Sequence, residues 1–260
     1  MTGPGNNTYL IDGADHMTLI DAGIGDAEHA GELSGYLAAH AKPLAEVLVT
    51  HVHADHASGA PHLARLFRPR FAKYLWQEED RRYDVEWRHL GDGDRVETGG
   101  HVLTALHTPG HSPDHLAFWH AESGTLFSGD LVNPAGSVTV AWSASGDMAA
   151  YLRSIERLVE LAPARLLPAH GPAVDRPGAL LRATINHRLQ RESQVRDAVA
   201  RGLSTVHAIT DSIYDGLDPA LVPAARENVR AHLEKLAHEG VVTRMGLDRM
   251  AGARWQLGRG

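Results

Sequence analysis

The chain contains no cysteine. Disulfide bonds, thiolate nucleophiles and thiolate metal ligands are therefore excluded, and any metal site must be built from imidazole and carboxylate groups. Long apolar runs are also absent, because no stretch approaches the roughly 20 apolar residues that a membrane-spanning helix needs. The N-terminal residues Met1 to Asn7 are small and polar, unlike a signal peptide. We therefore expect a cytoplasmic protein that does not cross a membrane.

Length and charge suggest how the chain is organised. Its 260 residues are 43% hydrophobic and 22% charged, which is enough to bury the core of one large domain, or of a large and a small one. The net charge of −7 is uneven, since acidic residues are in excess over residues 1–175 and basic residues over residues 176–260. This asymmetry predicts two regions, of which the second either faces a polyanion or presents an ordinary charged surface.

Short β-type runs alternate with helical ones through the first two thirds of the chain. We expect strands over residues 8–11, 17–20, 46–50, 102–107, 116–119, 125–128 and 165–168. A helix is predicted to begin after Asp147, a suitable N-cap, and to continue until Pro163, because apolar residues recur there at helical spacing. This mixture predicts a layered α/β body in which helices cover the faces of a sheet.

The last third of the chain has a different pattern. A long polar helix is predicted over residues 179–201 and ends at Gly202, and a further helix ends at Gly240. A second segment, residues 206–214, lies between them, and residues 241–244 and 253–257 are expected to form a hairpin. Helices followed by a hairpin are typical of a winged-helix module, and also of small helical caps. We expect two domains, residues 1–175 and 176–260.

The strongest signal for function is the segment that follows the predicted strand 46–50. Four of the six residues from 51 to 56 carry ligand-type side chains, namely His51, His53, Asp55 and His56. In an extended segment residues i and i+2 point the same way, so the two first histidines can chelate one ion, and the turn after them can direct the others toward a second. Because the chain has 18 histidines, two of them close together would be weak evidence for a metal site. The interpretation therefore depends on the other candidate ligands.

Three further candidate ligands are His111, Asp130 and His170, and each follows a predicted strand, where α/β folds gather functional groups. A glycine stands beside each of them and gives the backbone freedom to turn a ligand inward. Any one of these residues alone is explained by a hydrogen-bonded turn, but four separate segments are not expected to imitate metal ligands together.

Taken together, His-x-His-x-Asp-His, Gly-His, Gly-Asp and His-Gly resemble the signature of the metallo-β-lactamase superfamily, over about residues 8–175. The resemblance implies an αββα sandwich that works as a metal-dependent hydrolase. It implies that His51, His53 and His111 hold a first metal ion, that Asp55, His56 and His170 hold a second, and that Asp130 bridges them. Asp21 matches the family's first motif and is expected to orient ligands from behind, although it also fits a turn aspartate that caps a strand end. His115 is close enough for a similar role.

Two metal ions together define the expected chemistry. They acidify a shared water and polarise the scissile group, so we expect hydroxide to attack a carbonyl carbon or phosphorus, with Asp55 and Asp130 as catalytic residues. Nitrogen and oxygen ligands favour two zinc ions, with iron or manganese as alternatives.

Residues 129–138, 146–152 and 166–172 are also similar to the beta-lactamase-like protein 2 family. This likeness continues at residues 187–188, 191–192 and 194, and at residues 231–236 and 239–240. It implies a small C-terminal winged-helix domain. The chain begins almost at the family's first motif, so we expect an opening strand to be missing or shortened. One characterised branch cleaves single-stranded RNA, and the arginines of the long helix could attract phosphates, or pair with neighbouring residues.

Two alternatives stay open at this point. A small-molecule ester, thioester or lactone hydrolase resembling glyoxalase II, with weak promiscuous β-lactamase activity, would use the same metal residues. A nucleic-acid-binding regulator with a vestigial metal site is the alternative from another class, and the complete ligand set argues against it. The histidines outside the motifs, namely His62, His89, His101, His107 and His120, are expected to be surface or hydrogen-bonded structural residues.

Overall fold

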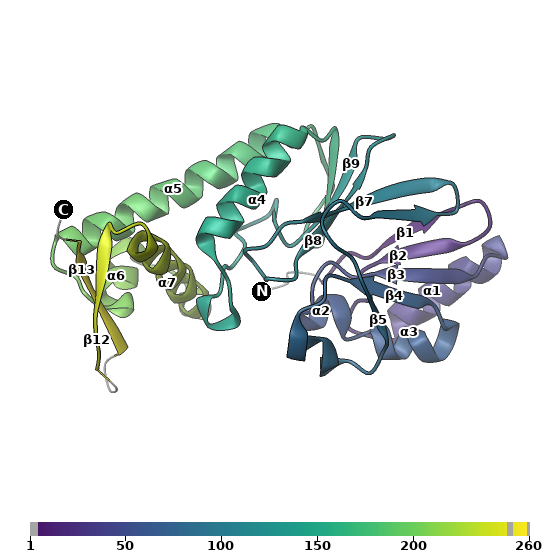
Figure 1. Cartoon of the computed structure of the whole chain (residues 1–260), viewed down its shortest axis with the longest axis horizontal. Coiled ribbons are helices and arrows are strands. Elements are labelled where there is room, and N and C mark those ends of the chain that lie inside the picture. Colours follow the sequence, from purple (N-terminus) through teal and green to yellow (C-terminus); the bar gives the residue numbers. More distant parts are fainter. Residues whose placement is uncertain (1–4, 249–251, 259–260) are drawn as a thin grey trace. The chain divides into compact units, whose positions relative to one another are not determined.

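Figure 1 shows the computed structural model of the chain, which describes residues 5–248 and 252–258. The chain divides into two compact units. The first unit comprises Met1–Pro109, Asp114–Ser137 and Leu161–Gly178, and the second comprises Gly110–Pro113, Val138–Glu160 and Ala179–Gly260. The chain thus passes between the units several times. The last passage lies near the domain boundary predicted at residues 175 and 176.

Two sheets form the first unit, and each has a simple strand order. The first sheet has the order β1-β2-β3-β4-β5, with bounds Tyr9–Asp12, Met17–Ile20, Leu44–Leu48, Arg70–Lys73 and Trp87–His89. The second sheet has the order β11-β10-β9-β8-β7-β6, with bounds Val174–Asp175, Arg165–Pro168, Thr125–Gly129, Leu116–His120, His101–His107 and Arg95–Thr98. The helical segments of this unit are α1 (Ala27–His40), α2 (Ala54–Ala57), α3 (Ala60–Phe67) and the 3-10 segment η1 (Gln77–Arg82).

The predicted strands are confirmed, with shifts of one or two residues at some ends. Strands β2 and β10 match their predictions at both ends, whereas β3 begins and ends two residues earlier than predicted. The sequence pattern did not predict β4, β5, β6 and β11. These strands are short and carry charged or polar residues among few apolar ones, so their periodicity is too weak to read.

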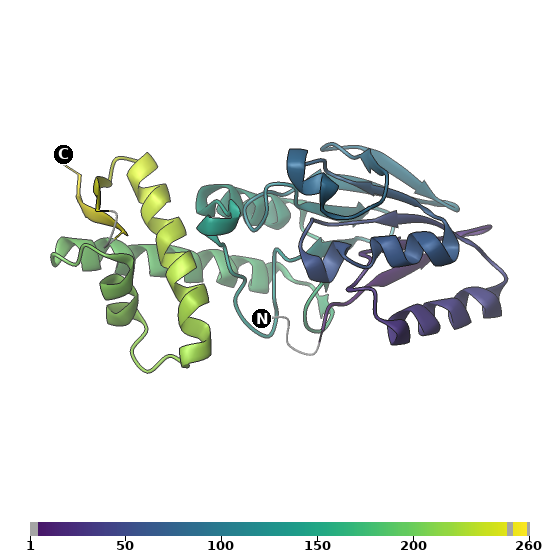
Figure 2. The same ribbon diagram turned by 90° about the horizontal axis from the view of Figure 1, so that it is seen from below.

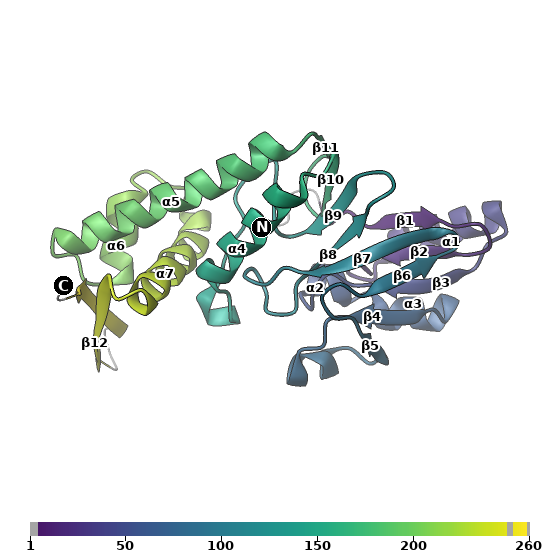
Figure 3. The same ribbon diagram turned by 45° about the horizontal axis from the view of Figure 1, so that its top comes forward.

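Apolar side chains on opposite faces of the first sheet belong to two different cores. Leu19 and Val47 pack into a buried cluster with residues of α1 and α3. Their neighbours Ile20 and Leu48 point the other way and pack against residues of the second sheet. Full burial of each such side chain stabilises the fold by about 1.5–3 kcal/mol. Figures 1 and 3 accordingly show the two sheets face to face, with α1 and α3 on the outer side of the first sheet, which confirms the predicted layered α/β class.

The second unit is mainly helical. Its elements are η2 (Trp142–Ala144), α4 (Met148–Leu161), α5 (Gly178–Ala200), α6 (Val206–Ile213), η3 (Pro219–Leu221), α7 (Val222–His238), β12 (Val242–Asp248) and β13 (Gly252–Leu257). Asp147 caps α4 as predicted, since its Oδ1 accepts a hydrogen bond of 2.9 Å from the backbone N–H of Ala150. Within the described residues, no helix is both long and apolar enough to cross a bilayer.

The C-terminal helices and hairpin share one core. Val195 of α5, Ile209 of α6, Leu233 of α7 and Trp255 of β13 are all buried in the same cluster. Figure 2 shows α7 crossing α5, and β12 pairs with β13 in the antiparallel register that the sequence predicts. Helices closed by a hairpin are the order expected of a winged helix.

Candidate metal centre

The segment that carries four candidate ligands leaves β3 in an extended form and then turns into α2. His51 and His53 lie in the extended part, and His51 Nε2 lies 2.9 Å from His53 Nδ1, so the two rings meet as their spacing predicts. His53 is the residue that precedes α2, which places Asp55 and His56 in the first turn of that short helix. The turn between the two pairs also brings the rings of His51 and His56 together, with their centroids 4.0 Å apart.

Side chains from three distant segments converge next to α2. His170 Nε2 lies 3.2 Å from Asp55 Oδ2 and 3.3 Å from Asp130 Oδ1. His56 Nε2 lies 3.6 Å from one oxygen of each of the same two carboxylates. Two sets of three, Asp55 with His56 and His170, and His51 with His56 and Asp130, have their ligand atoms within 4.8 Å of one another. The first unit thus brings together five of the predicted ligands.

The chemistry of this cluster fits a cation. His56 is fully buried, and its Nε2 makes no hydrogen bond within the described residues although it faces two carboxylates. Hydrogen bonds to Asp130 and Asp55 raise the pKa of His170 to about 10, although burial opposes them. Burial lowers the pKa of His56, but the nearby carboxylates of Asp21 and Asp130 reverse this effect and raise the pKa well above its usual value. Negative charge is thus concentrated around imidazoles, as a metal ion requires.

Two buried side chains, Asp21 and His115, form hydrogen bonds with candidate ligands on the side away from the cluster. Asp21 Oδ2 lies 2.8 Å from His56 Nδ1, and Asp21 Oδ1 accepts a hydrogen bond of 2.8 Å from the backbone N–H of Thr50. His115 Nε2 accepts a hydrogen bond of 3.1 Å from the backbone N–H of Asp130. Both contacts leave the far atoms of His56 and Asp130 directed into the cluster, and the orienting function of Asp21 and His115 stays a prediction.

Gly129 makes the close approach of His115 to Asp130 sterically feasible. Its φ angle is +50°, and a Cβ atom added there would lie 2.6 Å from His115 Nε2. A residue with a side chain would therefore displace the imidazole. This close contact explains why a glycine precedes Asp130.

The N-terminal segment is a part of the site that sequence reasoning missed. Asn7 donates hydrogen bonds from its side-chain amide to the carbonyl oxygens of Pro168 (3.0 Å) and Gly171 (2.8 Å), on both sides of His170. The carbonyl oxygen of Gly5 lies 2.9 Å from His170 Nδ1. Asn6 donates a hydrogen bond of 2.6 Å to the carbonyl oxygen of Asp55. The adjacent asparagines were the available signal, because buried amides pair with loop carbonyls.

His111 belongs to the second unit, unlike the other predicted ligands. Its Nδ1 lies 2.8 Å from the carbonyl oxygen of Thr139, which leaves Nε2 as the atom that can bind metal. The preceding Gly110 has φ +137°, and a Cβ atom there would lie 2.3 Å from the backbone of Tyr151. The assignment of His111 to the ion held by His51 and His53 stays a prediction.

The arginines of α5 do not form a continuous exposed row. Arg188 is only 2% exposed and lies 5.3 Å from the ring of Tyr151. Arg191 lies 4.5 Å from the ring of Tyr214 and donates a hydrogen bond to a glutamine of its own helix. Arg182 and Arg196 of this helix are exposed, and so is Arg201, which follows the end of α5. This arrangement favours the alternative in which several of these arginines pair with neighbouring residues.

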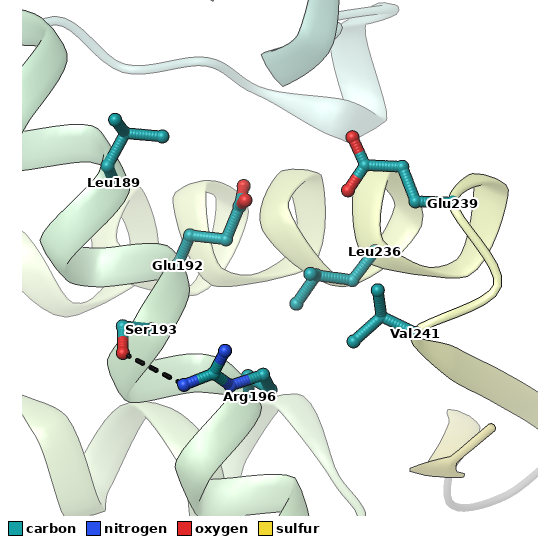
Figure 4. A pocket seen from close by; sticks show the side chains of 7 residues that line it. All are labelled: Leu189, Glu192, Ser193, Arg196, Leu236, Glu239 and Val241. Carbon is teal, nitrogen blue, oxygen red and sulfur yellow. Dashed lines mark hydrogen bonds between the residues drawn. The ribbon is translucent and has the colours of Figure 1, made fainter. Parts of the chain in front are cut away.

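A small pocket opens between α5 and α7 in the second unit. Its lining residues are Leu189, Glu192, Ser193, Arg196, Leu236, Glu239 and Val241 (Figure 4). Arg196 reaches Ser193 Oγ at 3.4 Å. Glu192 accepts a hydrogen bond of 2.7 Å from Lys235 on α7 and lies 3.1 Å from buried His232. These polar contacts hold α5 and α7 together.

Comparison with known proteins agrees with the geometry. Residues 1–170 match the profile of the Metallo-beta-lactamase superfamily, and residues 205–255 match that of the Beta-lactamase associated winged helix domain. The chain is 30% identical to a Beta-lactamase-like protein 2 homolog of Drosophila melanogaster, over 92% of this chain and 85% of the relative. It is 28% identical to an Atrochrysone carboxyl ACP thioesterase of Passalora fulva, over 96% and 75% of the two chains.

Solved structures show the same likeness. A beta-lactamase domain protein from Burkholderia ambifaria superposes with a TM-score of 0.82 at 25% identity, over 97% of this chain and 87% of that one. A second structure, TTHA1623 in a di-iron-bound form, superposes with a TM-score of 0.57 at 28% identity, over 67% and 92% of the two chains.

Proposed function

This chain belongs to the metallo-beta-lactamase superfamily and carries its associated winged helix domain, and from this premise we propose that it is a dinuclear metal-dependent hydrolase of acyl thioesters or esters. The observation that carries the proposal is the convergence of Asp55, His56, Asp130 and His170 around a buried imidazole nitrogen that makes no hydrogen bond within the described residues. A metal ion here would replace the protons of the two imidazoles and balance the charge of the two carboxylates.

Seven residues would hold the two ions. We assign His51, His53 and His111 to the first, Asp55, His56 and His170 to the second, and Asp130 to both. Zinc suits these nitrogen and oxygen ligands, and iron or manganese would suit them too. A relative solved in a di-iron-bound form supports keeping iron as an alternative. When bound, two such ions lower the pKa of a shared water and polarise the bond to be cleaved.

The residues of the chain itself prepare this site. Asp21 binds Nδ1 of His56 and so keeps Nε2 directed at the carboxylates. Asp55 and Asp130 act as the catalytic carboxylates, because their negative charge balances the cations while His115 holds the backbone of Asp130. Replacement of Asp130 by alanine should therefore lower both metal content and turnover, and unchanged values for both would overturn its assignment.

A thioester or another acyl ester is the substrate class that we favour. One support is the likeness to an acyl carrier protein thioesterase along 96% of the chain. A second is the arrangement on α5, where Arg188 is buried and Arg191 lies against a tyrosine ring, so two of the five predicted arginines are not free to contact an RNA backbone. Single-stranded RNA is the second candidate, because the chain carries a winged helix domain and exposed Arg182 and Arg201.

One panel of substrates tests these candidates. Metal-loaded protein and the Asp55→Ala variant are incubated with an acyl-carrier or glutathione thioester, a lactone, single-stranded RNA and a chromogenic cephalosporin. We expect cleavage of the thioester that is lost in the variant and after treatment with a chelator. Metal-dependent cleavage of RNA alone would replace the acyl assignment, and cleavage that survives metal removal would overturn the hydrolase mechanism itself.

A further inference from the structure

A second group of metal-binding side chains lies on the second sheet, away from the candidate metal centre. His101 begins β7, His120 ends β8 and Glu122 stands in the turn that leads to β9. One ligand atom of each lies within 4.8 Å of the others. The sequence predicted both histidines to be ordinary surface or structural residues, so their meeting is a result of the tertiary structure.

The register of the strands explains why these three side chains meet. Thr104 of β7 pairs with Trp119 of β8 in an antiparallel arrangement, so Leu103 stands opposite His120 when the same register is continued by one residue. Side chains alternate between the faces of a strand, so His101 and His120 share the face of Leu103, and Glu122 reaches them from the turn that follows β8. This is the face that packs against the first sheet, and the cluster lies where that apolar interface ends.

Hydrogen bonds of His120 leave one ring nitrogen available. Its Nδ1 lies 2.7 Å from Ser123 Oγ, and that hydroxyl donates its own hydrogen to Thr125 Oγ1 at 2.8 Å. In this arrangement the serine oxygen accepts from Nδ1–H, and Nε2 of the neutral ring then carries the lone pair. Nε2 is buried and makes no hydrogen bond within the described residues, and Glu122 Oε2 lies 4.0 Å from it. Either a metal ion or a proton on Nε2 would satisfy this nitrogen and the carboxylate together.

The geometry points to a further metal site: we propose that His101, His120 and Glu122 bind one divalent transition-metal ion. Two imidazoles and one carboxylate suit zinc, copper or nickel, and do not suit magnesium, which prefers oxygen ligands. Ser123 serves as the group that fixes the tautomer of His120, as hydrogen-bonded partners of metal-binding histidines commonly do. Glu122 is 84% exposed, so water would complete the coordination.

The ion at this second site has a structural purpose. It joins the start of β7 to the turn between β8 and β9, and Figure 3 shows these strands side by side. His101 and His107 stand at opposite ends of β7, six residue steps or roughly 20 Å apart. The residue after His107 is Thr108, and its Oγ1 lies 3.0 Å from Nδ1 of His115 at the candidate metal centre. The site is therefore distinct from the cluster around His56, and loss of its ion should leave the hydrolase active.

Zinc titration of the full-length chain tests the proposal. Metal-stripped wild-type protein is titrated with Zn²⁺ against a chromogenic chelator, beside His120→Gln and Glu122→Gln, with His207→Gln and Glu97→Gln as controls at exposed positions. We expect His120→Gln to bind one equivalent of zinc fewer than wild type. We expect Glu122→Gln to bind that equivalent at least about tenfold more weakly. Both controls should keep it, and activity should be unchanged in all four.

Nitrogen chemical shifts of the imidazoles separate a metal from a proton. A metal at this site shifts the Nε2 resonance of His120 on addition of Zn²⁺ at constant pH, and in Glu122→Gln, a substitution at an exposed position, the same shift should need at least about tenfold more Zn²⁺. If the His120 resonance responds only to pH, or if wild type and His120→Gln bind the same number of zinc ions, the cluster is an ion pair between protonated His120 and Glu122 and the proposal is wrong.

Discussion

Replacing Asp21 by asparagine should weaken metal binding at His56 without unfolding the protein. Asp21 is 2% exposed and has a left-handed backbone with φ +63°, a region that asparagine adopts readily. An amide oxygen can still accept the hydrogen bond from the backbone N–H of Thr50. The amide NH₂ group would then face Nδ1 of His56, which now lies 2.8 Å from a carboxylate oxygen. The substitution thus changes one hydrogen-bonding partner and keeps the shape.

The size of the effect follows from this reversed hydrogen bond. An amide donor at Nδ1 favours the tautomer with a proton on Nε2, which is the nitrogen directed at the carboxylates of the candidate site. Loss of such an orienting carboxylate weakens metal binding by about tenfold to hundredfold, or about 1.4–2.8 kcal/mol. Zinc affinity is measured by competition with a chromogenic chelator, and the fold is monitored by circular dichroism.

The matched control is Asp12→Asn, because Asp12 pairs with Lys42 at the surface of the same sheet. Its zinc affinity should stay within about twofold of wild type, as expected for an exposed ion pair. If Asp21→Asn is folded and also binds zinc as tightly as the control, Asp21 does not orient His56 and this reasoning fails.

Two further predictions concern the N-terminal segment and the second unit. Asn7→Ala removes two hydrogen bonds that flank His170, so we expect stability to fall by about 1–3 kcal/mol and zinc affinity to fall with it, whereas Asn186→Ala at an exposed position should change neither. Burial lowers the pKa of His232 below 6.5 although the hydrogen bond to Glu192 opposes it. At this residue the unfolded chain therefore binds more protons, so the Tm of wild type relative to that of His232→Gln should decrease as pH falls from about 7 to 5. A Tm difference that does not change with pH would contradict this assignment.

Much of the fold could be read from local patterns. Strands β2 and β10 follow apolar runs bounded by turns, and α4 follows a capping aspartate and a helical spacing of apolar residues. The short strands β4, β5, β6 and β11 could not be read, because each pairs with a neighbouring strand that supplies the hydrogen bonds its own sequence does not predict. The sequence also did not predict where the chain crosses from one unit to the other, since these crossings depend on contacts between distant segments.

By itself, the sequence determined which chemical groups are available: imidazoles and carboxylates without thiols, placed after strands and beside glycines. It could not specify the atoms that face each other, such as His170 against Asp55 and Asp130, or His101 against His120. These contacts arise from strand register and from loops that meet at the end of a sheet. Residues far apart in the sequence therefore come close only after the sheets have formed. The electrostatic environment of His56 was likewise decided by tertiary structure, because burial and the approach of two carboxylates act together only in the folded chain.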